Sequence, residues 1–119
     1  MPAKELTLAF IGAGRVGTGL ALSFARSGRR VAAVASHSIA SARKLARRVP
    51  GARAVSSLQD AADRADIVFL TVPDDAIEAV ASSIRWRAGA ACVHCSGAGD
   101  LDLLGKAAVQ GALVGGFHP

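Results

Sequence analysis

Three glycines near the N-terminus, spaced as Gly12-x-Gly14-x-x-Gly17, have the chemistry to hold a pyrophosphate group. In dinucleotide-binding loops the first glycine permits a tight turn, the second lets the pyrophosphate approach the backbone, and the third lets the next helix pack close to the sheet. A helix that begins near Arg15 would add unpaired N–H groups and the positive end of its dipole. The alternative is a glycine-rich turn without a ligand, because a chain with 13 glycines among 119 residues can contain the pattern by chance. The apolar run Leu6–Ile11 directly before the loop has the length of a strand and favours dinucleotide binding.

The segment after the second apolar run, Val31–Ala35, indicates which dinucleotide would bind. Domains that prefer NAD usually carry Asp or Glu at this point, where the carboxylate holds the ribose hydroxyls. Here the chain reads Ser36-His37-Ser38, with Arg43 shortly after and no carboxylate. Hydroxyl groups and a cation fit a 2′-phosphate, so the sequence favours NADP, with NAD as the less favoured cofactor. The alternative is structural: Ser38 or Ser41 caps the next helix, whose basic residues face solvent.

Few side chains could act directly on a substrate. His118 is the strongest candidate, because the ordinary pKa of histidine, about 6.5, suits proton transfer during the reduction of a carbonyl or imine. We favour, however, a structural hydrogen bond at the start of the connection to a following domain as the role of His118. Ser96 is weaker, since the Ser96-Gly97 pair lacks the glycine two residues earlier that a nucleophile elbow requires. Asp74 and Asp75 could form a catalytic carboxylate pair, but we favour the interpretation that they cap the following helix.

The two cysteines, Cys92 and Cys95, have the spacing of a redox or metal-binding pair. They lie in an apolar run of strand length, which would point them to opposite faces of a sheet. We therefore expect buried, reduced thiols. A zinc site that includes His94 is not favoured, because the chain offers no second pair of ligands. His94 itself is expected to be a core histidine.

The elements that would position these residues alternate between strands and helices. The pattern predicts strands over 6–11, 31–35, 52–55, 66–72, 91–95 and 112–115, and helices over 15–27, 39–49, 57–64 and 76–84, with a further helix capped by Asp100. Short connections between alternating elements favour an α/β fold: a doubly wound, Rossmann-type parallel sheet of about six strands in the order 3-2-1-4-5-6, in three layers. The first helix would bury Val16, Leu20 and Phe24, and the last Leu101 and Leu104. Thr71, Val72 and Pro73 would lie under the ribose or nicotinamide end of the cofactor.

Length and composition indicate one globular domain with a substantial apolar core, since 51% of the residues are hydrophobic. No apolar run reaches the roughly 18 residues that span a bilayer, and the N-terminus does not resemble a signal peptide, so we expect a cytoplasmic protein without a membrane partner. Residues 1–53 hold ten Lys/Arg and one acidic residue (+9), whereas residues 54–119 hold four and eight (−4). The basic half contains the glycine loop. A phosphorylated small ligand explains this asymmetry better than nucleic acid, because aromatic residues are few and dispersed.

Five segments together resemble the N-terminal Rossmann-like domain of a family of bacterial proteins assigned as NADP oxidoreductases. They are Ile11–Gly17, Val34–Ser36, Leu70–Asp75, Val93–Gly97 and Gly116–Pro119. The resemblance extends over essentially the whole chain and, more distantly, to pyrroline-5-carboxylate reductase and the 6-phosphogluconate dehydrogenase group. It implies a function as the cofactor-binding domain of an NADP-dependent oxidoreductase acting on a small carbonyl, imine or alcohol. The alternative is a non-catalytic NADP-binding sensor or regulatory module.

The resemblance also implies roles for individual residues. The pyrophosphate loop would consist of Gly12, Ala13, Gly14, Arg15, Val16 and Gly17. Ser36, His37 and Ser38 would meet the 2′-phosphate, and Val72, Pro73 and Asp74 the nicotinamide ribose. Ser96, Gly97 and His118 would lie beside the nicotinamide, on the substrate side.

In the family, a helical C-terminal domain follows the Rossmann-like domain and supplies much of the substrate pocket and the dimer interface. The chain of 119 residues ends where that domain would begin, so we expect residues 1–119 to be the dinucleotide-binding domain alone and incomplete as an enzyme. Apolar surface near Trp86, Leu113 and Phe117 would then favour a homodimer or association with the missing domain.

Overall fold

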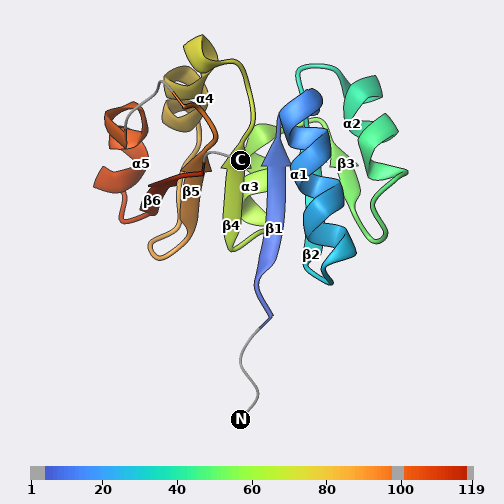
Figure 1. The fold of residues 1–119 in the computed structure, drawn as a ribbon. Helices are drawn as coiled ribbons and strands as arrows, with labels where there is room; N and C mark the ends of the chain where they lie inside the picture. The colour runs from blue at the N-terminus through green and yellow to red at the C-terminus, as the bar shows by residue number, and fades with distance from the viewer. Residues whose placement is uncertain (1–4, 98–100, 118–119) are drawn as a thin grey trace.

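The computed structural model describes residues 5–97 and 101–117 and contains one parallel sheet of six strands (Figure 1). The strand order is β3-β2-β1-β4-β5-β6, as predicted. The strands are β1 Thr7–Ile11, β2 Arg30–Ala35, β3 Arg53–Val55, β4 Ile67–Leu70, β5 Ala91–His94 and β6 Leu113–Gly116. The α-helices are α1 Arg15–Arg26, α2 Ile39–Ala46, α3 Leu58–Asp63, α4 Ile77–Ser83 and α5 Gly105–Val109, with two 3-10 helices, η1 Asp74–Ala76 and η2 Leu101–Leu104.

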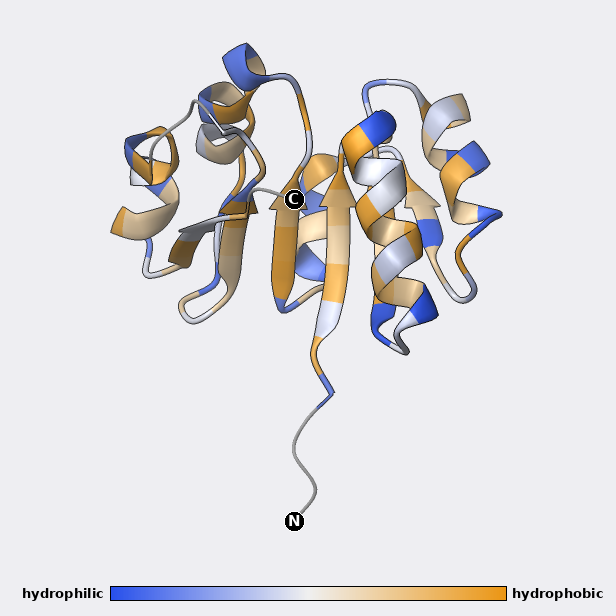
Figure 2. Ribbon diagram, viewed as in Figure 1, coloured by the Kyte–Doolittle hydropathy of each residue, from blue (hydrophilic) through white to orange (hydrophobic). Residues whose placement is uncertain are grey.

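Helices cover both faces of the sheet, so that its central strands are buried on both sides. Helices α1 and α2 pack on one face and α3, α4 and α5 on the other. Successive residues of β1 alternate between these two cores, with Phe10 facing α1 and Ile11 facing the opposite layer. Figure 2 shows the result as hydrophobic central strands and hydrophilic helix ends. The nearly continuous apolar run predicted this strand, because a central parallel strand is covered on both faces.

The register of the central strands brings their carboxyl ends to one level. Ile11 of β1 lies opposite Ala35 of β2 and Leu70 of β4. The ladder continues one residue beyond the strands, because the N–H of Gly12 donates to the carbonyl of Ala35 and the N–H of Thr71 donates to the carbonyl of Ile11, both over 2.8 Å. The segments that follow these three strands therefore leave the sheet side by side.

Several boundaries differ from those predicted. Helix α2 ends at Ala46 rather than Val49, because Pro50 disfavours helical backbone at the residue before it; Val49 is nevertheless buried. The helix predicted over 76–84 begins with the 3-10 turn η1, and its α-helical part starts at Ile77. Leu101 is 46% exposed, so only Leu104 of that predicted pair faces the core.

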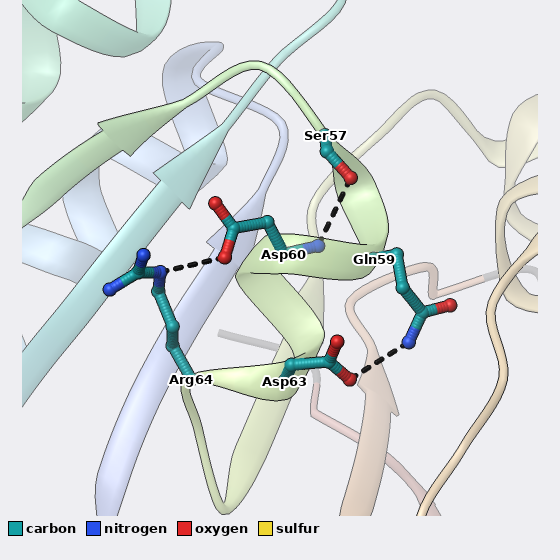
Figure 3. Close-up of polar contacts among 5 residues, drawn as sticks. All are labelled: Ser57, Gln59, Asp60, Asp63 and Arg64. Atoms are coloured by element: carbon teal, nitrogen blue, oxygen red, sulfur yellow. Dashed lines mark hydrogen bonds and ion pairs between the residues drawn. The ribbon is translucent and has the colours of Figure 1, made fainter.

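Helix α3 is held by polar contacts at its surface (Figure 3). The Ser57 hydroxyl caps it by accepting a hydrogen bond from the Asp60 N–H over 3.1 Å. Asp60 also pairs with Arg64 over 2.8 Å, and the Gln59 amide donates to Asp63. Because these groups are exposed, each pair contributes only about 0.3–0.5 kcal/mol. Their main effect is to fix where the helix begins and ends.

Trp86 is buried rather than exposed, which corrects the expectation that it forms part of an apolar surface patch. It is only 7% exposed, and its indole N–H donates to the carbonyl of Ala81 in α4 over 2.9 Å. The Gln110 side chain accepts from the Trp86 backbone N–H and so ties this segment to α5. Leu113 and Phe117 are exposed at 65% and 40%, as expected.

Within the part of the chain that the structure describes, no helix has the length and apolar character required to cross a membrane.

Candidate functional site

A cavity of about 790 Å³ lies at the carboxyl ends of the central strands. Its walls come mainly from the segments that follow β1, β2, β3 and β4. In the sheet, the connection from β1 leads toward β2 on one side, and the connection from β4 leads toward β5 on the other. Such a switch point is where doubly wound sheets bind their ligands, and the volume is in the range of small-molecule sites.

Most of the predicted cofactor-binding residues line this cavity, and a few lie elsewhere. Those in its walls are Gly12, Ala13, Gly14, Arg15, Val16, Ser36, His37, Val72, Pro73 and Asp74. Those outside its walls are Gly17, Ser38, Arg43, Ser96 and Gly97. His118 lies outside the described residues.

Gly12 makes the turn that carries the chain from β1 into the cavity wall. Its φ is +111°, in the left-handed region that residues with a side chain rarely adopt. A Cβ atom added there would lie 2.5 Å from the carbonyl oxygen of Thr71. Backbone conformation and space therefore both require glycine at this position.

Gly17 allows α1 to pack directly on the turn. A Cβ atom at this buried residue would overlap the carbonyl oxygen of Gly12 and would lie 2.6 Å from the hydroxyl oxygen of Thr71. Gly17 does not reach the cavity, so what it provides is the close approach of the helix.

Gly14 differs from the other two glycines because the space around it is open. A Cβ atom there would meet nothing within 4 Å. The residue precedes α1, whose first turn has neither a side-chain cap nor an acidic residue. Its unpaired N–H groups and dipole favour an anion, and the room beside Gly14 would allow one to approach the backbone. Val16, predicted to be buried, is 44% exposed in this wall.

The region after β2 presents small polar side chains to the cavity. Ser36, His37 and Ser41 line it, while Ser38 caps α2 by accepting from the Ser41 N–H over 3.3 Å. The structural interpretation of Ser38 is thus confirmed. Arg43 is exposed on α2, away from the cavity walls.

Asp74 is the one carboxylate among the described residues that line the cavity. It begins η1 together with Asp75, but neither carboxylate makes a capping hydrogen bond there, so the predicted cap is wrong. The physical reason is that the turn is closed by a backbone hydrogen bond instead of a side-chain one, because the Ala76 N–H donates to the Pro73 carbonyl over 2.9 Å. The Asp74 carboxylate is left exposed beside Val72 and Pro73.

The two cysteines lie on different sides of β5, as predicted. Cys92 is fully buried in the core, where burial raises the pKa of its thiol to about 12. Cys95 is half-buried and lines the cavity, and burial also raises its pKa. Neither cysteine forms a disulfide, and because their pKa values are raised both thiols are neutral at pH 7. Among the residues of segments 5–97 and 101–117, no group of acidic, histidine and cysteine side chains is placed to hold a metal ion.

His94 is a core residue, as predicted. It is 2% exposed, and its Nδ1 accepts a hydrogen bond from the Ser96 backbone N–H over 3.2 Å. His94 thus shapes the turn that leads to Ser96 and Gly97.

Some cavity residues were not anticipated as site residues. They are Ile11, Ser41, Ser56, Leu58, Ala76, Val80 and Cys95. Ser56 and Leu58 follow β3, which lies next to β2, so the predicted strand order could have indicated them. The hydrogen bond from the Thr71 hydroxyl to the Gly12 carbonyl, 2.8 Å long, was also not anticipated.

A family model described as the Rossmann-like domain matches residues 1–119. Among solved structures, a protein from Bacteroides fragilis that is assigned as an NADP oxidoreductase is 26% identical, with a TM-score of 0.77 over 97% of this chain and 44% of that one. An imine reductase variant from Myxococcus stipitatus, in complex with NAD+, is 27% identical, with a TM-score of 0.73 over 93% of this chain and 40% of that one.

A third similar structure shares the fold at lower identity. An imine reductase from Aspergillus terreus, in complex with NADPH4, is 20% identical, with a TM-score of 0.80 over 98% of this chain and 43% of that one. A search of curated proteins finds no match. The chain therefore spans less than half the length of the solved proteins that it resembles.

Proposed function

The chain belongs to the Rossmann-like domain family, and on that premise we propose that it is the NADP-binding domain of an oxidoreductase. The reaction would transfer hydride between the nicotinamide and a small carbonyl, imine or alcohol. Similarity to a protein assigned as an NADP oxidoreductase and to an imine reductase supports this class of reaction.

The observation that carries the proposal is the open space beside Gly14 in the cavity wall. Gly12 and Gly17 are enclosed by the turn, whereas the surroundings of Gly14 are empty and face the cavity. A bound pyrophosphate would occupy that space and accept hydrogen bonds from the N–H groups at the start of α1.

The choice of NADP over NAD rests on the residues that line the cavity after β2. Ser36, His37 and Ser41 supply two hydroxyls and an imidazole, and the segment after β2 contributes no carboxylate to the cavity wall. The Asp or Glu side chain that binds the ribose hydroxyls of NAD would repel a 2′-phosphate. Hydroxyl and imidazole groups, in contrast, can donate hydrogen bonds to a 2′-phosphate. In this proposed subsite Ser41 takes the place of Ser38 and Arg43, both of which lie outside the cavity walls.

The cofactor and the protein would have different roles in the reaction. The bound cofactor supplies the hydride, and the protein supplies its orientation. Val72 and Pro73 offer an apolar wall, and the Asp74 carboxylate can accept hydrogen bonds from ribose hydroxyls. The neutral Cys95 thiol lies in the wall contributed by the end of β5. Reduction of a carbonyl or imine also needs a proton, and His118 is our candidate donor.

The substrate side of the site is proposed to come from outside the described cavity. The similar proteins are more than twice as long as this chain. A further domain or a second copy of the chain would supply the rest of the substrate pocket. Homodimer formation stays a prediction of the resemblance.

Calorimetric titration with NADPH and NADH tests the proposed cofactor. We expect NADPH to bind at least about tenfold more tightly than NADH, which corresponds to one charge-assisted contact. Equal affinities would contradict the NADP assignment, and binding of neither would contradict dinucleotide binding. Binding without hydride transfer in the full-length protein would favour the sensor function instead.

A further inference from the structure

Two carbonyl groups of the glycine loop, those of Gly12 and Ala13, each accept a hydrogen bond from a threonine hydroxyl. The Thr71 hydroxyl, directly after β4, donates to the Gly12 carbonyl over 2.8 Å. The Thr18 hydroxyl, in α1, donates to the Ala13 carbonyl over 3.2 Å. The Thr71 oxygen also lies 3.2 Å from the Ile11 carbonyl, but a hydroxyl has one hydrogen and the shorter contact is to Gly12.

These bonds fix the direction of the N–H groups that follow. In a planar trans peptide the C=O and N–H bonds point in opposite directions. The Gly12 carbonyl points toward Thr71, so the Ala13 N–H points away from it. The Ala13 carbonyl points toward Thr18, so the Gly14 N–H points away from that side chain.

The N–H groups of Ala13 and Gly14 are available to a ligand. No hydrogen bond among the described residues uses either of them, and both residues line the cavity. Successive N–H groups directed to one side of the chain form an anion-binding concavity. Ala13 is partly exposed and Gly14 is exposed, so water can solvate these N–H groups until a ligand binds.

We propose that Thr71 and Thr18 are positioning residues that orient the loop to bind the cofactor pyrophosphate. This inference rests on the proposed function, because the anion is the pyrophosphate of the dinucleotide. Thr71 is placed to have the larger effect. Its hydroxyl oxygen lies under the first turn of α1, at the position that a Gly17 side chain would need, so it contacts the turn and the helix together.

The test compares variants that keep the shape of threonine and remove its hydroxyl. We would titrate wild type, Thr71→Val and Thr18→Val with NADPH, ADP and adenosine. We expect Thr71→Val to weaken NADPH and ADP about tenfold and adenosine by less than about twofold, because adenosine lacks the pyrophosphate. Thr71→Ser, which keeps the hydroxyl, should restore binding to within about threefold of wild type.

Thr7→Val is the matched control. The Thr7 hydroxyl also makes a hydrogen bond in the sheet, to Asp66 over 3.0 Å, but at the opposite end of β1. It should alter thermal stability without a selective loss of ADP. If Thr71→Val does not fold, the same comparison is made between Thr18→Val and Thr7→Val.

A second measurement reports on the backbone amide groups of the loop themselves. In amide NMR spectra, adding inorganic pyrophosphate should shift the Ala13 and Gly14 signals of wild type more than those of Thr71→Val. If wild type binds NADPH while both valine variants bind ADP as tightly as wild type, the positioning role is wrong and the proposed function stands. If wild type binds neither dinucleotide nor pyrophosphate, the proposed function itself is wrong.

Discussion

A Cβ atom at Gly12 would lie 2.5 Å from the carbonyl oxygen of Thr71, a residue 59 positions further along the chain. The glycine that begins the loop is therefore required by the end of a neighbouring strand as much as by its own backbone. The glycines of the loop are therefore of two kinds. Gly12 and Gly17 are required by the packing of the turn, whereas Gly14 has open space beside it.

We expect Gly12→Ala to lower the free energy of unfolding by about 2–4 kcal/mol, through the positive φ and the close contact with Thr71. Urea denaturation would measure the loss. Gly19→Ala is the control, because Gly19 lies in α1 with nothing within 4 Å of an added Cβ atom. It should raise stability by about 0.5–1 kcal/mol. Equal stability of the two variants would contradict the structure of the turn.

Gly14→Ala should have the opposite profile and lose binding without losing stability. Its φ of −79° suits alanine, and the added methyl group meets no protein atom. The methyl group would, however, occupy the space proposed for the pyrophosphate, so we expect NADPH affinity to fall at least about tenfold. Calorimetry and thermal unfolding measure the two properties, with Gly19→Ala again as control. Unchanged NADPH affinity would show that the loop is only a turn.

His37→Asp should exchange the cofactor preference. His37 is exposed in the cavity wall after β2, where an acid would repel a 2′-phosphate and accept hydrogen bonds from ribose hydroxyls. We expect NADPH affinity to fall at least about tenfold while NADH binds as well as before or better. His37→Asn, which is similar in size to Asp and uncharged, isolates the effect of charge. Parallel losses for both cofactors in the Asp variant would place the 2′-phosphate elsewhere.

The buried thiol of Cys92 should make stability fall in alkaline solution. Its pKa is about 12 in the folded protein against 9.0 for an exposed thiol, so above pH 9.0 the unfolded chain loses this proton first. Stability from this group is complete below pH 9.0 and decreases as pH rises toward 12. Denaturation at about pH 8 and about pH 11 should show a smaller decrease for Cys92→Ala than for wild type. The test is the change in the free energy of unfolding between the two pH values, and not its absolute value, because removing a core side chain lowers stability at every pH.

Self-association, if it occurs through the open edge of the sheet, should depend on Leu113. This residue is 65% exposed on β6, one of the two edge strands, whereas the Phe117 ring lies against Phe24 and Phe69. Leu113→Lys should leave thermal stability nearly unchanged and shift sedimentation from dimer to monomer, because charged residues block edge pairing. A wild-type monomer, or a dimer unaffected by the substitution, would contradict this prediction.

The sequence predicted the elements whose signals are local. The apolar run of β1, the glycine spacing and the alternation of strands and helices were sufficient for the six-stranded order. Ser38 was assigned to the 2′-phosphate site, with capping by Ser38 or Ser41 as the alternative; the cap, whose partner Ser41 lies three residues away, is what the structure shows. Helix ends were less accurate, since the burial of Val49 continues the helical pattern beyond the point where Pro50 stops the helix.

The remaining features depend on contacts between distant segments, which no local pattern encodes. Neither the Thr71 hydroxyl bond nor the placement of Ser41 and Cys95 in one cavity follows from spacing alone. Apolar surface was expected near Trp86, yet its hydrogen-bond partners, Ala81 in α4 and Gln110 at the end of α5, come from two distant segments and hold it in the core.

The register that places Ile11 level with both Ala35 and Leu70 also has a consequence for folding. The first half of the chain contains the whole glycine motif but not the strand that holds its turn in place. The loop can take the shape seen here only once β4 has docked beside β1, so the proposed anion site requires both halves of the chain. A ligand that binds the native state alone stabilises it in proportion to its concentration. Cofactor added during refolding would therefore trap molecules whose two halves have already joined, and would leave half-folded chains unaffected.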